Sequence, residues 1–321
     1  MPSALAGPWI RLLWAATATT GSVTASHATT DAHFPMAIVG DTQRTLWVER
    51  LVRRAQNDES RDLLSAAIAA AAPRTFIHLG DLVSYGSSPK EWQRFDAWVE
   101  PIRASGAKAF AVVGNHDTWG APSLTQMRKR FPELSADRHY GARAGDLDLL
   151  FLDSNLTKES WDRQRTWLEA SLAAADDDPT VRGVMIFLHH PPFTLARGHA
   201  GHRRARAELV PSLFRSSKVL AVFSGHAHGY ERFEAGGKTF VVSGGGGGPR
   251  VEYRGCDEAP AGVRCAFDAG SGARPFHFVW LAREQDTIVA EVRTVPTLER
   301  PFADPVDRFV LELIPAREPP P

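Results

Sequence analysis

The sequence predicts an α/β fold built from short buried strands, and two observations lead to this prediction. Several continuous apolar runs have the length of a buried strand, and each leads into a polar loop and then into apolar residues at helical spacing. After residue 239 the helical spacing disappears, and strand-like runs separated by turns follow. No internal repeat or interdomain linker interrupts this order. We therefore expect strands and helices to alternate first and strands to dominate the last part.

The first part contains three expected strands, with two helices between the first and second strands and one helix between the second and third. Proline cannot continue a helix, so Pro73 ends the second predicted helix. In the third, Trp92, Phe95 and Val99 fall on one face. The strands are expected at 36–39, 75–79 and 109–113, and the helices at 46–55, 62–72 and 91–102.

The rest of the chain continues this pattern less regularly. A helix is expected around Trp167 and Leu168, with Ser160 or Asp162 as its N-cap, because short polar side chains accept hydrogen bonds from the first N–H groups of a helix. Another helix is expected at 208–214. The remaining strands are expected at 147–152, 184–188, 220–223, 239–242, 277–282, 287–294 and 308–313.

The N-terminus resembles a secretory signal. Residues 1–28 contain Arg11, then a short apolar stretch, then small residues that end at Ala28. This pattern predicts cleavage and export, so that the mature protein is periplasmic or secreted. The alternative is a disordered leader on a cytoplasmic protein. At the other end, residues 316–321 are expected to form a disordered tail.

The two cysteines bear on the same question. Cys256 and Cys265 lie in a polar loop, where a close pair indicates a disulfide and therefore an oxidising compartment. The alternative is a pair of free thiols. Their spacing differs from Cys-x-x-Cys, which argues against a zinc site.

Charge and hydropathy argue against a nucleic-acid partner and against a membrane span. The chain has 37 basic and 37 acidic residues, whereas a nucleic-acid-binding protein usually presents a strongly basic surface. No segment beyond the leader approaches the ~20 apolar residues of a membrane span. We therefore expect neither a nucleic-acid partner nor a membrane span.

Polar residues with metal-ligand chemistry follow or end the predicted strands. In open α/β sheets, ligands bind beyond the carboxyl ends of the strands. Carboxylates, amides and imidazoles there exceed the needs of one closed tetrahedral zinc site and suit two metals that share a carboxylate. His226 and His228 alternate along an extended segment, which would direct them to different metals. The candidate ligands are Asp41, Asp81, Asn115, His189, His226 and His228, with Gln43 as a further candidate.

The ordered set of these motifs resembles the calcineurin-like metallophosphoesterase superfamily. It comprises Gly-Asp twice, then Gly-Asn-His-Asp, His-His-Pro-Pro and Gly-His-x-His, and it spans about residues 36–230. The stretch 225–232 and the glycine run after Ser243 are most similar to the purple acid phosphatase branch. The resemblance implies a metallophosphoesterase domain at 29–315. The implied fold is a two-sheet mixed β-sandwich flanked by helices, with metals at the C-terminal ends of strands.

The resemblance also implies a role for each candidate. Asp41 and His228 would hold one metal and Asp81 would bridge both; Asn115, His189 and His226 would hold the other. His116 would protonate the leaving oxygen or stabilise developing charge. The two ions would be divalent or trivalent Fe, Mn or Zn, and a metal-bound hydroxide would attack phosphorus in line. A phosphomonoesterase is the leading function. The alternatives are a phosphodiesterase with the same core and a degenerate scaffold that binds a partner without catalysis.

Two positions depart from the family pattern. Gln43 stands where the common pattern has a histidine, and Ser84 stands where purple enzymes have a tyrosine, with Tyr85 one residue later. The coloured iron–tyrosinate centre is therefore not expected. Gln43 could ligate through its carbonyl oxygen, bind a metal-bound water, or leave the first site weaker.

Other histidines carry two readings each. His78 lies inside a predicted strand and is expected to be a core histidine rather than a ligand, and His190 is expected to pack behind its neighbouring ligand rather than to bind metal. His199 lies in an arginine-rich loop that is either a solvated surface or a lid in which His199 touches the substrate phosphate. The glycine run 244–248 lacks the Gly-Lys-Ser/Thr of a P-loop, and its small residues are expected to let the backbone pass close to the site.

Overall fold

The computed structural model describes most of the chain from residue 32 onward. The described residues are 32–46, 51, 57–120, 124–134, 137–267, 275–295 and 305–315. They belong to one compact unit, Asp31–Pro321. The expected signal peptide at 1–28, most of the expected helix at 46–55 and the expected tail at 316–321 lie outside the described residues.

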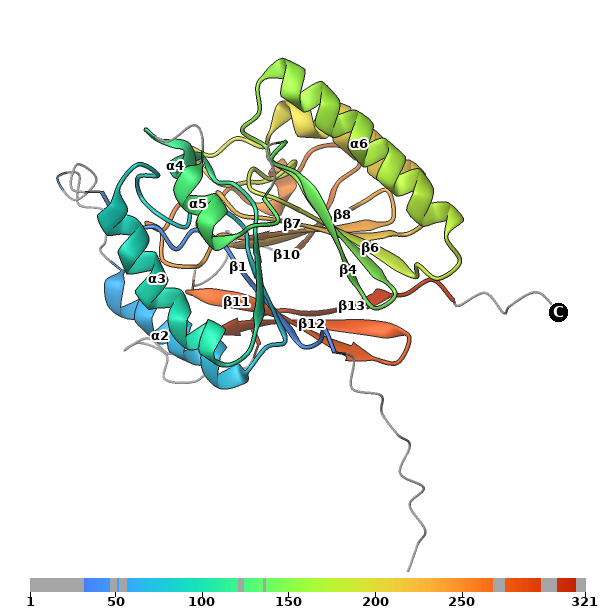
Figure 1. Ribbon diagram of the computed structural model, residues 1–321. Helices are drawn as coiled ribbons and strands as arrows, with labels where there is room; N and C mark the ends of the chain where they lie inside the picture. Colours follow the sequence, from blue (N-terminus) through green and yellow to red (C-terminus); the bar gives the residue numbers. More distant parts are fainter. Residues whose placement is uncertain are drawn as a thin grey trace, which may run out of the picture. The chain divides into compact units, whose positions relative to one another are not determined.

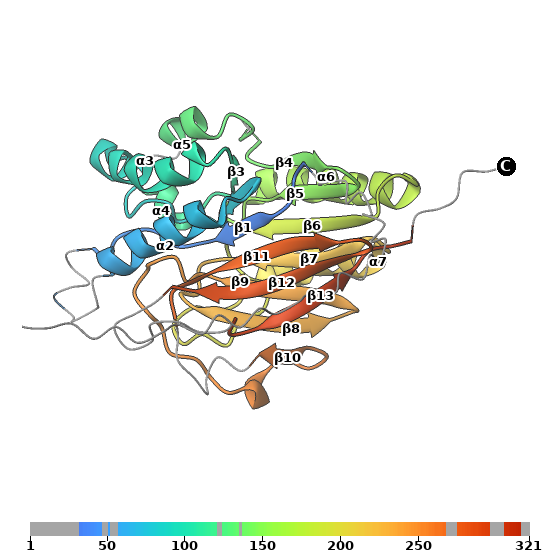
Figure 2. The same ribbon diagram turned by 90° about the horizontal axis from the view of Figure 1, so that it is seen from below.

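Two sheets form the centre of this unit. Figure 1 shows one above the other, and Figure 2 shows β11, β12 and β13 running side by side. The first sheet has the order β13-β12-β11-β1-β2-β3, with β1 (Met36–Val39), β2 (Thr75–His78), β3 (Lys108–Ala111), β11 (His277–Glu284), β12 (Thr287–Thr294) and β13 (Arg308–Glu312). The second has the order β10-β8-β9-β7-β6-β5-β4, with β4 (Tyr140–Ala144), β5 (Leu147–Phe151), β6 (Gly183–Leu188), β7 (Val219–Ser224), β8 (Tyr230–Ala235), β9 (Lys238–Ser243) and β10 (Arg264–Phe267).

The strands that carry the motifs are parallel to one another within each sheet. β1 pairs with β2, and β2 with β3, in parallel register. In the second sheet β5, β6 and β7 are likewise parallel. Every residue of β1, β2, β6 and β7 is buried, which explains why these strands read as continuous apolar runs. Their carboxyl ends therefore lie on one edge of each sheet.

Helices flank the two sheets or lie in the loops that connect the strands (Figure 1). They are α2 (Asp58–Ala71), α3 (Pro89–Ala104), α4 (Asn115–Thr118), α5 (Thr125–Arg130), α6 (Lys158–Asp177), the π-helical η1 (Ala205–Leu209), α7 (Val210–Arg215) and the 3-10 turn η2 (Cys256–Glu258). Figure 1 shows α6 on the side of the second sheet that faces away from the first.

The core is divided between the two faces of the second sheet. Leu149 and Phe151 of β5 pack in the cluster that contains the first sheet, whereas Leu150 and Leu152 pack in the cluster that contains Trp161 of α6. This division follows from the two-residue period of a strand, which points successive side chains to opposite faces. The second sheet therefore shares one face with the first sheet and the other with helices.

The predicted fold class is confirmed, with differences in detail. The predicted strands are all present within one or two residues of the predicted ends. β4, β8, β10, α4 and α5 were not predicted, because they are short or alternate apolar with charged residues. The predicted N-cap of α6 is wrong. Its N-cap is Thr157, and both Ser160 and Asp162 lie inside the helix, because the strong helix formers Lys158 and Glu159 extend it toward the N-terminus.

Candidate metal centre

Loops from both sheets converge at the carboxyl ends of the central strands. From the first sheet, Asp41 follows β1, Asp81 follows β2 and Asn115 follows β3. From the second sheet, His189 follows β6, and His226 and His228 follow β7. The two sets meet, because His189 of the second set contacts both Asn115 and Asp81 of the first.

A first cluster consists of Asp41, Asp81 and His228, which are all buried. Their potential ligand atoms lie within 4.8 Å of one another, and Nε2 of His228 is 3.5 Å from Oδ1 of Asp41. Nδ1 of His228 donates to the carbonyl of Pro249 at 2.7 Å. A carbonyl can only accept, so this bond fixes the tautomer that leaves Nε2 facing the carboxylates. That is the tautomer a metal ligand requires.

A second cluster consists of His189, His190 and His226, whose ring nitrogens also lie within 4.8 Å of one another. Nε2 of His189 is 3.1 Å from Oδ1 of Asn115, and Nδ1 of His189 donates to the carbonyl of Leu79 at 2.8 Å. An imidazole nitrogen and an amide oxygen thus meet here. The prediction gave His190 only a packing role, whereas the structure also places one of its ring nitrogens in this cluster.

Asp81 belongs to the first cluster and also contacts the second. Its Oδ2 lies 3.2 Å from Nε2 of Gln43 on the side of the first cluster and 3.5 Å from Nε2 of His189 in the second. Its Oδ1 accepts the backbone N–H of His116 at 2.9 Å. Gly114 makes this approach feasible, because a Cβ at Gly114 would lie 2.2 Å from Oδ1 of Asp81. The arrangement matches a carboxylate shared between two metal sites.

The backbone is strained at three of the predicted ligands. Asp41, Asp81 and His226 have φ values of 65°, 55° and 68°. Such left-handed conformations cost free energy in non-glycine residues and concentrate at functional sites. The value at His226 also corrects one expectation. His226 and His228 face separate clusters as expected, but they do so from a tight turn rather than from an extended segment.

The buried carboxylate and imidazole groups of this site shift one another's pKa values. Burial alone would raise the pKa of Asp81, but the nearby His189 and His116 lower it. Burial lowers the pKa of His189, yet the charge of Asp81 and the hydrogen bond to it raise that pKa to about 10. In the metal-free protein a proton on His189 therefore neutralises part of the carboxylate charge. Bound cations would displace this proton.

Gln43 provides a direct test of whether the donors suit a metal. Its Nε2 lies 3.2 Å from both Asp81 and His228, while its Oε1 is buried and has no hydrogen-bond partner among the described residues. A half-turn of the amide would exchange the two atoms and bring Oε1 to the first cluster. Oxygen, nitrogen and carboxylate donors would then surround one point, so the residues fit a hard or borderline cation.

His116 and His199 lie beside the clusters. Nδ1 of His116 donates to the carbonyl of Ser84 at 3.1 Å, and its Nε2 is 3.9 Å from Oδ2 of Asp81. The ring of His199 lies 4.9 Å from that of His226, between centroids. The arginine-rich loop thus brings His199 to the site.

The remaining motif residues make structural contacts outside the two clusters or close to them. His78 is buried and hydrogen-bonds Thr42 at 2.9 Å, as expected for a core histidine. The side chain of Ser84 donates to the carbonyl of Arg44, and Tyr85 is 46% exposed. The glycine run passes close to the first cluster, as expected: Gly248 N–H donates to the carbonyl of Asp41 at 2.9 Å.

Sequence reasoning missed two positioning side chains. The buried carboxylate of Asp117 accepts backbone N–H groups of Asp81 and Gly114, each at 2.9 Å. Arg61 donates to the carbonyls of Gln43 and Gly247 at 3.0 and 3.1 Å. Asp117 could have been found by its place after Gly-Asn-His, whereas nothing local in the sequence marks Arg61.

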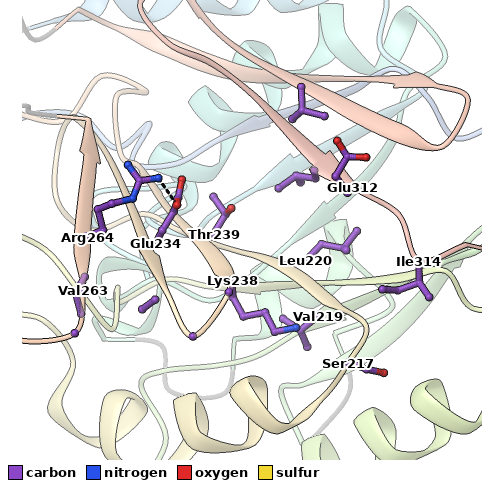
Figure 3. Close-up of a pocket in the computed structure, with 16 residues that line it drawn as sticks. Ser217, Val219, Leu220, Glu234, Lys238, Thr239, Val263, Arg264, Glu312 and Ile314 are labelled. Atoms are coloured by element: carbon purple, nitrogen blue, oxygen red, sulfur yellow. Dashed lines mark ion pairs between the residues drawn. The ribbon is translucent and has the colours of Figure 1, made fainter.

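A separate cleft of about 810 Å³ lies at the other end of the second sheet. Figure 3 shows its lining, which includes Leu220, Lys238, Glu312 and the ion pair between Arg264 and Glu234. The cleft touches the first residues of β7, whereas His226 and His228 follow its last residue, roughly 16 Å further along the strand. It contains none of the predicted site residues.

Comparison with known proteins gives a consistent result. The family model described as calcineurin-like phosphoesterase matches residues 34–230. Purple acid phosphatase 22 of Arabidopsis thaliana is 28% identical over 222 residues, which cover 65% of this chain and 48% of that protein. Glycerophosphodiester phosphodiesterase GpdQ of Enterobacter lignolyticus is 33% identical over 171 residues, covering 49% of this chain and 56% of that protein. The chain thus spans about half the length of these relatives.

A solved structure shows the same fold. Purple acid phosphatase PPD1 from yellow lupin (Lupinus luteus) seeds superposes with a TM-score of 0.67 at 18% identity, covering 87% of this chain and 53% of that one. Within the described residues, no helix is both long and apolar enough to cross a membrane.

Proposed function

The chain belongs to the calcineurin-like phosphoesterase family, and on this premise we propose that it hydrolyses phosphoric monoesters at a centre of two metal ions. The observation that carries the proposal is the position of Asp81. Its carboxylate lies in the first cluster, where it also contacts Gln43, and it approaches the second cluster at His189. A shared carboxylate between two sets of ligand-type side chains is the arrangement that a dinuclear phosphoester hydrolase requires.

The proposal assigns each ligand to a site. Asp41, Gln43 and His228 would hold one ion, Asn115, His189 and His226 would hold the other, and Asp81 would bridge them. Gln43 would ligate through Oε1, which is supported by the absence of a hydrogen-bond partner for that buried atom among the described residues. When bound, the ions would polarise the phosphoryl oxygens and lower the pKa of a water molecule toward neutrality. Fe, Mn and Zn all suit these donors.

The other side chains would handle protons and position the substrate. The hydrogen bond from Nδ1 of His116 to Ser84 orients the imidazole, so that Nε2 can carry a proton to the leaving oxygen. His199 would donate to a phosphoryl oxygen, which its position beside His226 supports. The substrate would thus be held between the imidazoles of His199 and His116.

A phosphodiesterase is the second candidate function. The observation that favours it is the 33% identity to a glycerophosphodiester phosphodiesterase. Both reactions need the same metal core, and they differ in whether the site admits a second ester group. A scaffold that binds a partner without catalysis is disfavoured, because six of the seven predicted ligand positions keep the family residue type.

Export is part of the proposal. Cys256 and Cys265 form a disulfide, and disulfides persist in oxidising compartments. We expect residues 1–28 to be removed on the way to the periplasm or the medium. N-terminal sequencing of the mature protein tests this: an intact Met1 in the cytoplasmic fraction would refute it.

The function is tested by counting metals and assaying two matched substrates. The purified protein is reconstituted with Mn, Fe or Zn, its metals are counted by elemental analysis, and an aryl phosphate monoester is compared with the matching diester. We expect near two metals per chain and faster hydrolysis of the monoester. Asp81→Asn is the matched control, because it removes the shared charge at nearly constant volume. No turnover with any metal would refute the hydrolase, and a preference for the diester would select the second candidate.

A further inference from the structure

Two exposed aromatic rings lie beside His116. Trp119 is 38% exposed and Tyr85 is 46% exposed, although large aromatic side chains are mostly buried in this protein. The ring of Trp119 lies 3.9 Å from that of His116, and the ring of Tyr85 meets Trp119 edge-on at 6.0 Å, between centroids. We call Tyr85 and Trp119 the aromatic pair.

The aromatic pair is presented by two loops that are tied together. The N–H of Gly86 donates to the carbonyl of His116 at 3.0 Å, and the N–H of Ser87 donates to the carbonyl of Trp119 at 3.1 Å. Gly86 packs so closely that a Cβ there would lie 1.8 Å from the carbonyl oxygen of Asp117. The rings are therefore held by ordered backbone before any ligand arrives. This order lowers the entropic cost of using them for binding.

Their position indicates what they bind. In the proposed reaction His116 delivers a proton to the leaving oxygen, so the organic part of the leaving group must lie on the side of His116. Trp119 is in van der Waals contact with His116, so its exposed surface lies within reach of a group bound beside that imidazole. Exposed aromatic surface beside a reactive group costs solvation free energy unless a ligand covers it. A flat aromatic partner gains most from such rings, because it can stack offset on one ring or meet it edge-on.

We propose that the aromatic pair is the binding site for a planar aromatic group on the leaving alcohol of the substrate. This proposal rests on the proposed function and adds the class of ester that the site selects. Such a group can come from a phenol, in an aryl phosphate, or from a base, in a nucleoside monophosphate. Both share a flat π system that can stack on Trp119, and the experiment separates them.

The test uses two substrate pairs that differ only in the aromatic group. Phenyl phosphate is compared with cyclohexyl phosphate, and adenosine 5′-monophosphate with ribose 5-phosphate. We expect Trp119→Leu and Tyr85→Leu to lower kcat/KM about tenfold for the aromatic member of a pair, the size of one lost stacking contact, and less than about twofold for the other. A response in the first pair alone assigns a phenol-like group, and a response in the second alone assigns a base. Phe214→Leu is the matched control, because Phe214 is 39% exposed and lies on α7.

A purely structural role of the aromatic pair predicts a different result. Trp119 touches His116, so a disturbed imidazole would lower kcat/KM equally for all four substrates, and equal loss would overturn the proposal. Calorimetric binding of phenylphosphonate and cyclohexylphosphonate to the metal-loaded protein gives a readout without turnover. If the wild type binds the phenyl compound more tightly and Trp119→Leu abolishes this difference, the proposal is supported even when no ester is hydrolysed. The absence of hydrolysis would refute only the proposed function. Equal binding of both phosphonates overturns it.

Discussion

At the scale of single residues, Gln43 is one of the two positions where the sequence departs from the pattern that its family resemblance implies. Its amide lies 3.2 Å from both Asp81 and His228, and its oxygen is buried without a hydrogen-bond partner among the described residues. A buried acceptor without a hydrogen-bond partner destabilises the folded protein, and a cation bound to that oxygen would offset this cost. We therefore expect Gln43→Ala to bind one of two metals at least roughly tenfold more weakly, since ligand loss has effects of that order.

Gln43→His provides the comparison, because it restores the common family residue. It should bind both metals at least as tightly as the wild type in metal titrations followed by elemental analysis. If Gln43→Ala kept both metals with unchanged affinity, Gln43 would act only through hydrogen bonds.

His116 is the second residue whose role can be isolated. It contacts Asp81 only through its backbone N–H and a 3.9 Å approach of Nε2, so its imidazole is not needed to hold the carboxylate. We expect His116→Ala to lower kcat by roughly 10²-fold to 10³-fold, the usual contribution of a proton donor. Metal content, measured on the same preparation, should stay unchanged. Coincident loss of metal would show that His116 is a ligand instead.

At the scale of elements, Glu231 ties β8 to the loop after β6. Its carboxylate is buried and accepts the hydroxyl of Thr194 and the backbone N–H of Leu195. Burial raises the pKa of Glu231 to about 7, although both hydrogen bonds oppose the rise. In the unfolded chain the same group has a pKa of about 4.5. The folded protein therefore holds this proton between pH 4.5 and 7, where the unfolded chain has released it.

The sign of the pH effect follows from this difference. Because the folded state binds more protons in that window, its stability falls as pH rises from 4.5 to 7, by about 3 kcal/mol from this group. Glu231→Gln keeps the size of the side chain and removes the titration. In urea unfolding at pH 5 and pH 8, the wild type should lose more stability than the variant by roughly that amount. An equal pH dependence of the two proteins would contradict the prediction.

Elements differ in how well the sequence predicted them. β1, β2, β6 and β7 were predicted because both of their faces are buried, so each is a continuous apolar run. β8 has one face against the core and reads Tyr-Glu-Arg-Phe-Glu-Ala, in which charges hide the apolar alternation. β8 pairs with β9 across the two-residue turn Gly236–Gly237, a local hairpin signal that the predicted strand positions did not take into account.

The candidate metal centre likewise has features that the sequence predicted and features that it did not. The candidate ligands could be named from the sequence, because each follows or ends a recognisable strand and belongs to a motif with fixed spacing. The place of Asp81 between the two clusters was implied by the family resemblance alone, whereas the nitrogen of His190 in the second cluster and the contact of Tyr85 with Trp119 were not predicted. Each of these contacts joins side chains from different loops, and only the packing of the loops determines it.

At the scale of the whole molecule, the candidate metal centre joins the two sheets. Asp41, Asp81 and Asn115 follow strands of the first sheet, and His189, His226 and His228 follow strands of the second. In the metal-free protein, hydrogen bonds such as those from His189 to Asn115 and Leu79 hold the two edges together. Metal ions would replace these bonds by coordination across the sheets. The centre should therefore contribute to the stability of the whole sandwich.

Metal removal should accordingly lower Tm of the entire fold in a single transition. A ligand present at 100 times its Kd stabilises the folded state by about 2.7 kcal/mol per site, which corresponds to roughly 5 °C for a chain of this size. Calorimetry before and after chelation measures this shift, and re-addition of metal should reverse it. Asp81→Asn is the control, because its Tm should respond little to the chelator. If chelation removed both metals and left the Tm of the wild type unchanged, the ions would not be held between the two sheets, and the ligand assignment would have to be confined to one of them.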